Sequence, residues 1–286
     1  MKRLRAVWLG CLLMLSPLVA TAVETPRVVA LSWEMVEHLL KLGITPVAVA
    51  EAPDYRTWVV HPELPASVPD AGSRTEPNLE LLVQLKPDLI LITPLLEDIR
   101  PQLQRIAPVV VYGDFTQAQN NLLLQRRNFL DLASRLRRVE IAHQQLAAMD
   151  ARIAGLRRAI AERFAGRPPE VAVVRFASPT AVLIMGPNSM PEHAMQLLGL
   201  QPAYPTPASR WGSVQVSVTE LGRITQGVVL YIEPFAQRER LFGTRLWQQM
   251  PFVEQGRVAA MRSTWTHGGI FCVENLAVAI AQAMQF

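Results

Sequence analysis

Runs of Val, Ile and Leu alternate with helical patterns along most of the chain. "RVVALS" (27–32) and "EVAVVRFA" (170–177) are continuous apolar runs, and each is followed by a segment with helical spacing. Continuous apolar strands separated by helices are typical of parallel sheets that are covered on both faces. The pattern predicts an α/β fold with mostly parallel sheets.

The pattern repeats in two halves. Leu-Gly-Ile-Thr-Pro (42–46) and Leu-Gly-Leu-Gln-Pro (198–202) both end a helix, with Gly at the position of a left-handed C-cap and Pro after it. The units that follow also match in order: "NLELLVQLKPDLILI" with "SVTELGRITQGVVLYI", and "RIAPVVVYG" with "PFVEQGRVAAM". We therefore expect two similar α/β sandwich lobes.

A stretch without proline, 117–167, separates the halves. Its apolar residues recur at spacings of three, four or seven, from Phe129 to Phe164, which predicts one amphipathic helix or two in series. A helix over 135–164 would be roughly 45 Å long at the usual rise per residue. We expect a stiff connecting helix (135–166) that limits hinge opening between an N-terminal lobe (23–134) and a C-terminal lobe (167–286).

The first 22 residues predict a cleavable secretory signal peptide. They have a basic start, an apolar run and an Ala-Thr-Ala cleavage pattern. Of 28 basic residues, Lys2, Arg3 and Arg5 lie in this segment; against 24 acidic residues, the mature net charge is about +1. This balance gives no support to nucleic-acid binding. Cys272 is then the one cysteine left, so no internal disulfide can form.

Unusual loops fall where the carboxyl ends of the strands should meet, the place at which open parallel sheets bind ligands. Arg74 precedes a helix that we expect over 75–85, an unfavourable place for a positive charge unless something compensates it. Three tryptophans in facing loops predict a ligand with a large apolar surface. We expect Arg74 to bind a cluster of partly negative oxygens, the alternative being a surface pair with Glu76. The candidate ligand-binding residues from these loops are Arg74, Trp58, Trp211, Trp265 and His267.

Several blocks resemble one family. "LPASVPDAGSRTEPNLELL" (64–82), together with "YRTW", "GPNSM", "RWGS" and "RLWQQMPF", is similar to the periplasmic ferric-hydroxamate siderophore-binding proteins. The resemblance implies a bilobal protein with a rigid helical backbone that delivers an iron-loaded siderophore to an inner-membrane ABC permease. It implies that the siderophore holds the iron, with no intrinsic cofactor and no metal bound by the protein, and a periplasmic monomer. It assigns Arg74 to the hydroxamate oxygens and Trp58, Trp211 and Trp265 to the pocket, with Asn188 and Ser213 as weaker assignments.

Two loops depart from that family. Pro94, Leu95 and Leu96 occupy a loop where the family prototype has a tyrosine hydroxyl, and Thr266 and His267 replace two aromatic residues after Trp265. The pocket should therefore differ in shape and hydrogen bonding, and the preferred siderophore stays open. A single arginine suits a nearly neutral ferric trihydroxamate better than a trianionic tris-catecholate. The arginines that border the same loops and could change this count are Arg56, Arg210 and Arg262.

The resemblance also implies acidic docking residues for the permease on both lobes. Glu80 and Glu220 lie in matching helices of the two repeats, with Glu76 as a further candidate.

Three rival functions remain. The five histidines show no short metal-binding spacing, which disfavours direct metal binding. A haem or cobalamin carrier of the same architecture is possible, with His267 as an axial ligand. An exported hydrolase is disfavoured because the chain lacks the usual nucleophile and metalloprotease motifs, although Asp114, His267 and Ser213 could meet in the cleft.

Overall fold

A computed structural model describes residues 25–285 except 114 and 117, and it contains two β-sheets. The sheet of the N-terminal lobe has the order β2-β1-β3-β4, and its strands are parallel throughout. Its strands are β1 (Val28–Ala30), β2 (Ala48–Val49), β3 (Leu89–Ile92) and β4 (Val109–Val111).

The sheet of the C-terminal lobe has the order β7-β6-β5-β8-β9. Its strands β5, β8 and β9 are parallel, whereas β6 pairs antiparallel with both β5 and β7. These strands are β5 (Val171–Phe176), β6 (Ala181–Met185), β7 (Ser213–Ser217), β8 (Val228–Ile232) and β9 (Val258–Met261).

The two sheets correspond as the sequence repeat predicts. β1, β3 and β4 match β5, β8 and β9 in order and direction. The counterpart of β2 is a single parallel bridge between Val171 and Pro202. The antiparallel pair β6–β7 is an addition of the second half. The prediction of two mostly parallel α/β lobes is confirmed.

The helices lie on both faces of each sheet. In the N-terminal lobe they are α1 (Trp33–Lys41), α2 (Ala52–Trp58), α3 (Leu79–Leu85), the 3-10 helix η1 (Pro94–Ile99), α4 (Arg100–Leu103) and α5 (Asn121–Arg135). After the long helix α6 (Val139–Arg163) come α7 (Met190–Leu198), the 3-10 helix η2 (Val218–Arg223), α8 (Arg238–Phe242), α9 (Arg245–Gln248), α10 (Pro251–Glu254) and α11 (Cys272–Ala283).

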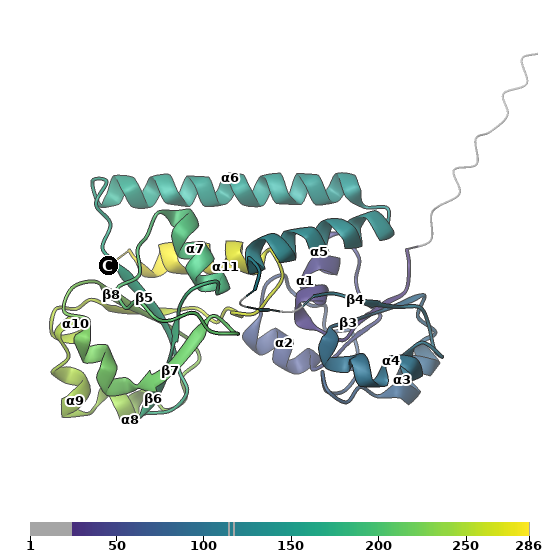
Figure 1. The fold of residues 1–286 in the computed structure, drawn as a ribbon, viewed down its shortest axis with the longest axis horizontal. Helices are drawn as coiled ribbons and strands as arrows, with labels where there is room; N and C mark the ends of the chain where they lie inside the picture. The colour runs from purple at the N-terminus through teal and green to yellow at the C-terminus, as the bar shows by residue number, and fades with distance from the viewer. Residues whose placement is uncertain (1–24, 114, 117, 286) are drawn as a thin grey trace, which may run out of the picture.

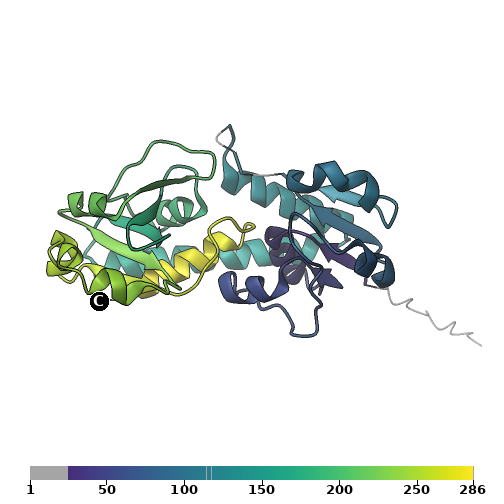
Figure 2. The same cartoon turned by 90° about the horizontal axis from the view of Figure 1, so that it is seen from below.

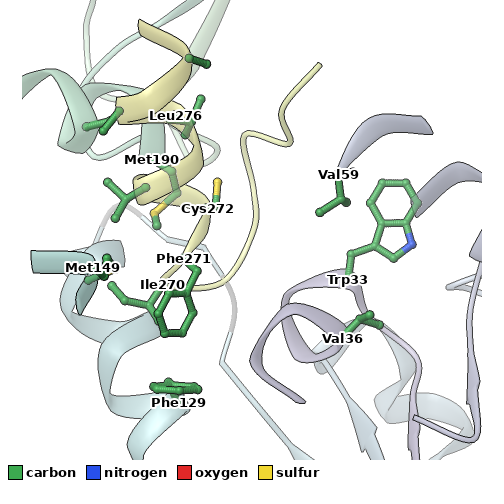
Figure 3. Close-up of a cluster of buried hydrophobic side chains, with 14 of the residues drawn as sticks. Trp33, Val36, Val59, Phe129, Met149, Met190, Ile270, Phe271, Cys272 and Leu276 are labelled. Carbon is green, nitrogen blue, oxygen red and sulfur yellow. The ribbon is translucent and has the colours of Figure 1, made fainter. Parts of the chain in front are cut away.

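Alternate residues of each strand face different cores, as the two-residue period of a strand requires. Val28 and Ala30 of β1 pack into a core that continues through both lobes, whereas Val29 packs into a second core beneath α3 and α4. A third core lies on the outer face of the C-terminal sheet, where Trp247 is buried. The continuous core includes Phe129, Met149, Met190 and Phe271, which come from α5, α6, α7 and the residue before α11 (Figure 3).

The stretch without proline forms two helices in series, which is one of the two expected arrangements, and the helix within 135–166 spans Val139–Arg163. Arg135 ends α5, and the chain turns at 136–138, where Arg137 adopts a positive φ of 55°, before α6 begins. With 25 residues, α6 is about 37 Å long. It lies across both lobes, above α5 on one side and above α7 and α11 on the other (Figure 1, and Figure 2 from below). The lobe limits given above remain our proposal.

The helix expected over 75–85 begins only at Leu79. Asn78 caps it, since its Oδ1 accepts a hydrogen bond from Leu81 N at 3.0 Å, and residues 72–77 form a turn closed by a bridge between Gly72 and Pro77. Arg74 is therefore not adjacent to the helix dipole. The predicted signal peptide (1–22) lies outside the described residues. Across the described residues, none of the helices is both long and apolar enough to cross a membrane.

Candidate functional site: a cleft between the lobes

A cleft of about 790 Å³ opens between the two lobes. The N-terminal lobe and the crossover after β4 line it with Leu31, Ser32, Glu34, Arg74, Thr93, Pro94, Leu95 and Phe115. The C-terminal half of the chain contributes Leu183, Arg210, Trp211, Ser213, Trp265 and His267. Several N-terminal residues follow the carboxyl ends of β1, β3 and β4, as expected for a parallel sheet.

Arg74 is held at the cleft from two directions. Its Nε donates to Glu51 Oε2 at 2.7 Å, and its backbone N–H donates to Glu51 Oε1 at 3.1 Å. The guanidinium carbon lies 4.0 Å from the centre of the Trp33 ring and 5.7 Å from that of Trp265. Within the described part of the chain, the two terminal nitrogens of Arg74 have no protein hydrogen-bond partner, so they are available to a ligand. The compensation for the charge of Arg74 is thus Glu51, and the alternative pairing with Glu76 is wrong.

Glu51 adopts a left-handed conformation, with φ 53° and ψ 49°. A residue other than glycine persists there only when its surroundings hold it. The backbone N–H of Glu51 donates to Gly72 O at 2.8 Å and to Asp70 Oδ1 at 3.0 Å, which fixes the strained residue. Partial burial opposes ionisation of Glu51, but the hydrogen bonds and charge of Arg74 outweigh it and lower the pKa of the carboxyl.

Trp33 does not line the cleft but lies behind two residues that do, Arg74 and Trp265. It is 2% exposed, its Nε1 donates to Ala50 O at 3.0 Å, and its ring meets that of Trp265 edge to face at 4.8 Å. Its position three residues after β1 was the available clue, but the sequence does not distinguish a tryptophan that supports a site from one in the ordinary core.

The C-terminal lobe supplies a more exposed wall. Trp211 is 47% exposed, and the guanidinium carbon of Arg210 lies 5.0 Å from its ring centre. Gly212 has a φ of +67°, and a Cβ there would lie 2.6 Å from Ser189 N, so the turn that presents Trp211 requires glycine. Trp211 lies just before β7, and Ser213 is the first residue of this strand, which belongs to the inserted β6–β7 pair.

His267 lies at the meeting of the two walls. Its ring contacts those of Phe115, Trp211 and Trp265 at 5.6–5.7 Å between centres, and its Nδ1 is 3.1 Å from Thr266 Oγ1. Burial lowers the pKa of His267 to about 4, although a hydrogen bond with the Trp211 backbone opposes this shift. The imidazole is therefore neutral at neutral pH and adds no charge to the cleft.

Two predicted ligand-binding residues do not line this cleft. Trp58 ends α2 and packs against the continuous core, with the guanidinium of Arg175 5.5 Å from its ring centre. Asn188 instead joins the crossover segment to α7. Its Nδ2 donates to the backbone oxygens of Thr116 and Gln119 at 2.9 and 2.7 Å, and its Oδ1 accepts from Asn121 N at 2.9 Å. All of its side-chain hydrogen-bonding capacity is thus directed at the protein.

In the loop 94–96, which departs from the family, two residues line the cleft and the third is buried in the core. Leu95 is 62% exposed and lines the cleft with Pro94, whereas Leu96 is 2% exposed and belongs to the core. The exposed Leu95 follows a buried strand, so its exposure could not be read from the sequence.

Of the three arginines that could change the charge count, only Arg210 lines the cleft. Arg56 donates to the backbone oxygens of Leu64, Pro65 and Val68, and Arg262 lines a separate cavity of about 310 Å³. The lining of the main cleft thus carries Arg74, Arg210 and Glu34 as charged residues. This mixed lining is far from the strongly basic site that a trianion would need.

The proposed docking glutamates lie away from the cleft lining. Glu80 is exposed in the first turn of α3, and Glu220 is half-exposed in η2, where it accepts hydrogen bonds from Arg223 Nη1 at 3.0 Å and Tyr204 OH at 3.1 Å. Those two hydrogen bonds lower the pKa of Glu220. Glu76 is exposed in the turn after Arg74. Because α3 and η2 each precede a parallel strand, both begin at the carboxyl edge of their sheets.

No group of three or more His, Cys, Asp and Glu side chains that could hold a metal occurs among the described residues. Of the three residues that a hydrolase could use, His267 and Ser213 line the cleft, and Asp114 lies outside the described residues.

Comparison with known proteins places the chain among solute receptors. Residues 28–264 match the periplasmic binding protein family. The Iron(3+)-hydroxamate-binding protein FhuD of Escherichia coli K12 is 34% identical over 251 residues, which are 87% of this chain and 83% of that protein. The achromobactin-binding periplasmic protein of Dickeya dadantii is 28% identical over 268 residues, or 88% of this chain and 84% of that protein.

A solved structure is similar over the whole bilobal fold. It is that of the siderophore-binding protein FhuD from Vibrio cholerae with Fe³⁺–Desferal bound, with a TM-score of 0.88 and 41% identity over 91% of this chain and 98% of that chain. With a family match that spans most of its length, this chain belongs to the periplasmic binding proteins.

Proposed function

We propose that this protein captures ferric hydroxamate siderophores in the cleft between its lobes and delivers them to an inner-membrane ABC permease. The relatives named above support the ligand class, since one is an iron(3+)-hydroxamate-binding protein and another was solved with Fe³⁺–Desferal. The side chains that line the cleft support the same ligand class independently of these relatives.

The observation that carries the proposal is the arrangement of Arg74. Its Nε is occupied by Glu51, its ring neighbour Trp33 lies 4.0 Å away, and its terminal nitrogens are left for the cleft. A planar fork of donors suits adjacent oxygens that bear partial negative charge, such as those that ligate ferric iron in a hydroxamate complex. Indole rings around it suit the apolar linkers of such a chelate.

Trp211, Trp265, Ser213 and His267 then line the ligand, and Leu95 meets it with an aliphatic surface. We assign Trp58 and Asn188 to supporting roles because of their positions outside the lining. The siderophore supplies the iron ligands, so the protein acts without a cofactor of its own and without turnover. Release from a monomer to a permease and its cytoplasmic ATPase, from the periplasmic side, completes the proposed role.

Tryptophan fluorescence tests the proposal. Titration of the mature protein with ferrichrome, ferrioxamine, ferric aerobactin and ferric enterobactin should give saturable quenching with the hydroxamates and weak or no quenching with enterobactin. Trp211→Ala should reduce the quenching, because Trp211 is the exposed tryptophan of the cleft. Trp247→Phe is the matched control: this residue is buried in the outer core, and its loss should leave ligand-induced quenching unchanged.

A haem carrier is the alternative that the same experiment tests. A Soret band after addition of haem, with no response to any hydroxamate, would replace our proposal. The structure disfavours an axial role for His267, because its ring already interacts with Thr266 and with the Trp211 backbone.

A further inference from the structure

The loop 262–271 belongs to the second half of the sequence but is fastened to the N-terminal lobe. At its start, Ser263 Oγ donates to the backbone oxygens of Thr57 and Trp58 at 2.9 and 3.3 Å. At its end, the Ile270 N–H donates to Nε2 of His38, a fully buried residue of α1, at 3.0 Å.

Glu37 makes the tightest part of this attachment. Its Oε1 accepts from Phe271 N at 2.9 Å and from Cys272 N at 3.0 Å, and the side chain is buried. These N–H groups are at the beginning of α11, where a helix leaves its first amides without partners. The Cys272 N–H also donates to Gly269 O at 3.1 Å, but Phe271, the residue before α11, offers no side-chain acceptor. A residue of α1 thus provides the side-chain cap of α11.

Glycines allow the close approach. A Cβ on Gly269 would lie 2.4 Å from His38 Nε2 and 2.7 Å from Glu37 Oε1, and one on Gly268 would lie 2.6 Å from Cys272 Cβ. Any side chain at residue 269 would push the loop away from α1. The Gly-Gly pair is therefore a requirement of this contact.

The fastened loop carries two lining residues of the cleft, Trp265 and His267. Trp265 meets Trp33 at 4.8 Å, and both rings are near the guanidinium of Arg74. The loop also contacts the C-terminal lobe, where Arg175 Nη2 donates to Thr264 O at 2.9 Å. Its hydrogen bonds to the N-terminal lobe at both ends nevertheless fix Trp265 relative to Trp33 and Arg74.

We propose that Glu37 and His38 are positioning residues that assemble the Arg74–Trp33–Trp265 wall on the N-terminal lobe before a ligand arrives. The inference rests on the proposed function, since it concerns affinity for the same ligand. Neither residue lines the cleft; both act through the backbone of the loop. If this wall is already ordered in the free protein, binding does not have to supply the free energy of ordering it, and the affinity is higher.

Binding measurements on matched variants of α1 test the proposal. Glu37→Ala removes the acceptor of two N–H groups and should weaken ferrioxamine binding about tenfold or more, measured well below the unfolding temperature. Glu37→Gln keeps Oε1 and should bind within about twofold of the wild type. Leu39→Ala is the control, because it creates a cavity beside the same helix and removes none of the hydrogen bonds to the loop. It should lower the unfolding temperature but leave the dissociation constant nearly unchanged.

A second variant shows whether the effect depends on one particular substitution. A second measurement, made on the free protein, shows whether it depends on the ligand. Gly269→Ala should displace the loop from the other side and weaken binding as Glu37→Ala does. The Trp33–Trp265 pair should give a coupled near-ultraviolet circular dichroism signal that Trp265→Phe identifies in the free protein. Glu37→Ala and Gly269→Ala should diminish it, and Glu37→Gln and Leu39→Ala should retain it.

Wild-type affinity in the Glu37→Ala or Gly269→Ala protein, or equal weakening in Leu39→Ala, would overturn the positioning role. If Glu37→Ala does not fold, Gly269→Ala decides the question by the same two measurements. If the wild-type protein binds no hydroxamate, the proposed function fails, and the dichroism signal alone still decides whether Glu37 positions Trp265.

Discussion

Arg74 and Glu51 show how a single charged pair prepares a binding surface. The carboxylate takes the Nε and backbone N–H of Arg74 and leaves the outer edge of the guanidinium for the cleft. Glu51 accepts a left-handed backbone conformation to do so. The pair is partly exposed, so its contribution to the free energy of folding is small, and its value lies in orientation.

We expect Arg74→Ala to weaken ferric-hydroxamate binding by about 2 kcal/mol, roughly thirtyfold, because a charged donor is removed from a partly desolvated site. Glu51→Gln retains an acceptor for the arginine but loses the charge, and should weaken binding by less than about tenfold. Equilibrium titration monitored by tryptophan fluorescence measures both. Arg105→Ala, at an exposed site beyond α4, is the control and should bind as the wild type does. An unchanged dissociation constant in Arg74→Ala would remove this residue from the site.

At the scale of elements, the buried contact between α1 and the start of α11 has a consequence for stability. Burial raises the pKa of Glu37 to about 8, although backbone hydrogen bonds and Lys41 oppose this shift. Its folded pKa lies above its unfolded value, so the folded protein retains a proton that the unfolded chain gives up. The stabilisation by Glu37 is fully present below about pH 4.5 and is lost as the pH rises through about 8.

We therefore expect the free energy of unfolding to decrease between pH 6.5 and pH 8, and to decrease less in Glu37→Gln, which cannot ionise. Burial lowers the pKa of the neighbouring His38 to about 3, so His38 contributes the opposite trend, mainly below its usual value of 6.5. The chosen interval separates the two residues. Urea unfolding at several pH values measures the slope, and identical slopes in the two proteins would show that Glu37 stays ionised in the fold.

At the scale of the whole molecule, α6 and the continuous core beneath it join the lobes. Phe129, Met149, Met190 and Phe271 come from four segments and pack into one cluster, which opposes wide separation of the lobes (Figure 3). The glutamates that we propose for docking, Glu80 and Glu220, would then be held at a nearly constant separation, whether or not a ligand is bound. A permease could recognise such a pair by charge.

We expect Glu80→Arg combined with Glu220→Arg to abolish siderophore-dependent growth and iron uptake while leaving the dissociation constant unchanged, because neither residue lines the cleft. The matched control reverses two exposed charges of α6, Glu140→Arg with Glu162→Arg, on the side of the molecule away from the sheets (Figure 1). Uptake should survive in the control. Normal uptake in the first double variant would exclude these glutamates from docking.

Much of this architecture is local information that the sequence contains. Apolar runs and their spacing specify strands and helices, and the glycine-proline pairs at 42–46 and 198–202 mark equivalent helix ends, so the two α/β halves could be predicted. The "GSRTEPN" and "RWGS" segments likewise gave Arg74 and Trp211 as residues of the cleft lining. The start of the helix at Leu79 could not be predicted, because the turn at 72–77 is closed by a bridge between backbone groups, and such a bridge leaves no pattern in the sequence.

Contacts between distant parts of the chain were decided by tertiary structure alone. Trp58 and Trp265 are both expected at the cleft from the sequence, and both pack against the continuous core. Only Trp265 lines the cleft, where its ring meets that of Trp33, whereas the guanidinium of Arg175 lies near the ring of Trp58. Glu51 as the partner of Arg74, and α1 as the support of a loop more than 200 residues away, have no local pattern at all. Periodicity and capping act over a few residues, so the sequence by itself determined the strands and helices that the two halves share and their order, but not the inserted β6–β7 pair. Burial and charge pairing depend on which surfaces meet when the two lobes pack, and only the folded chain determines that.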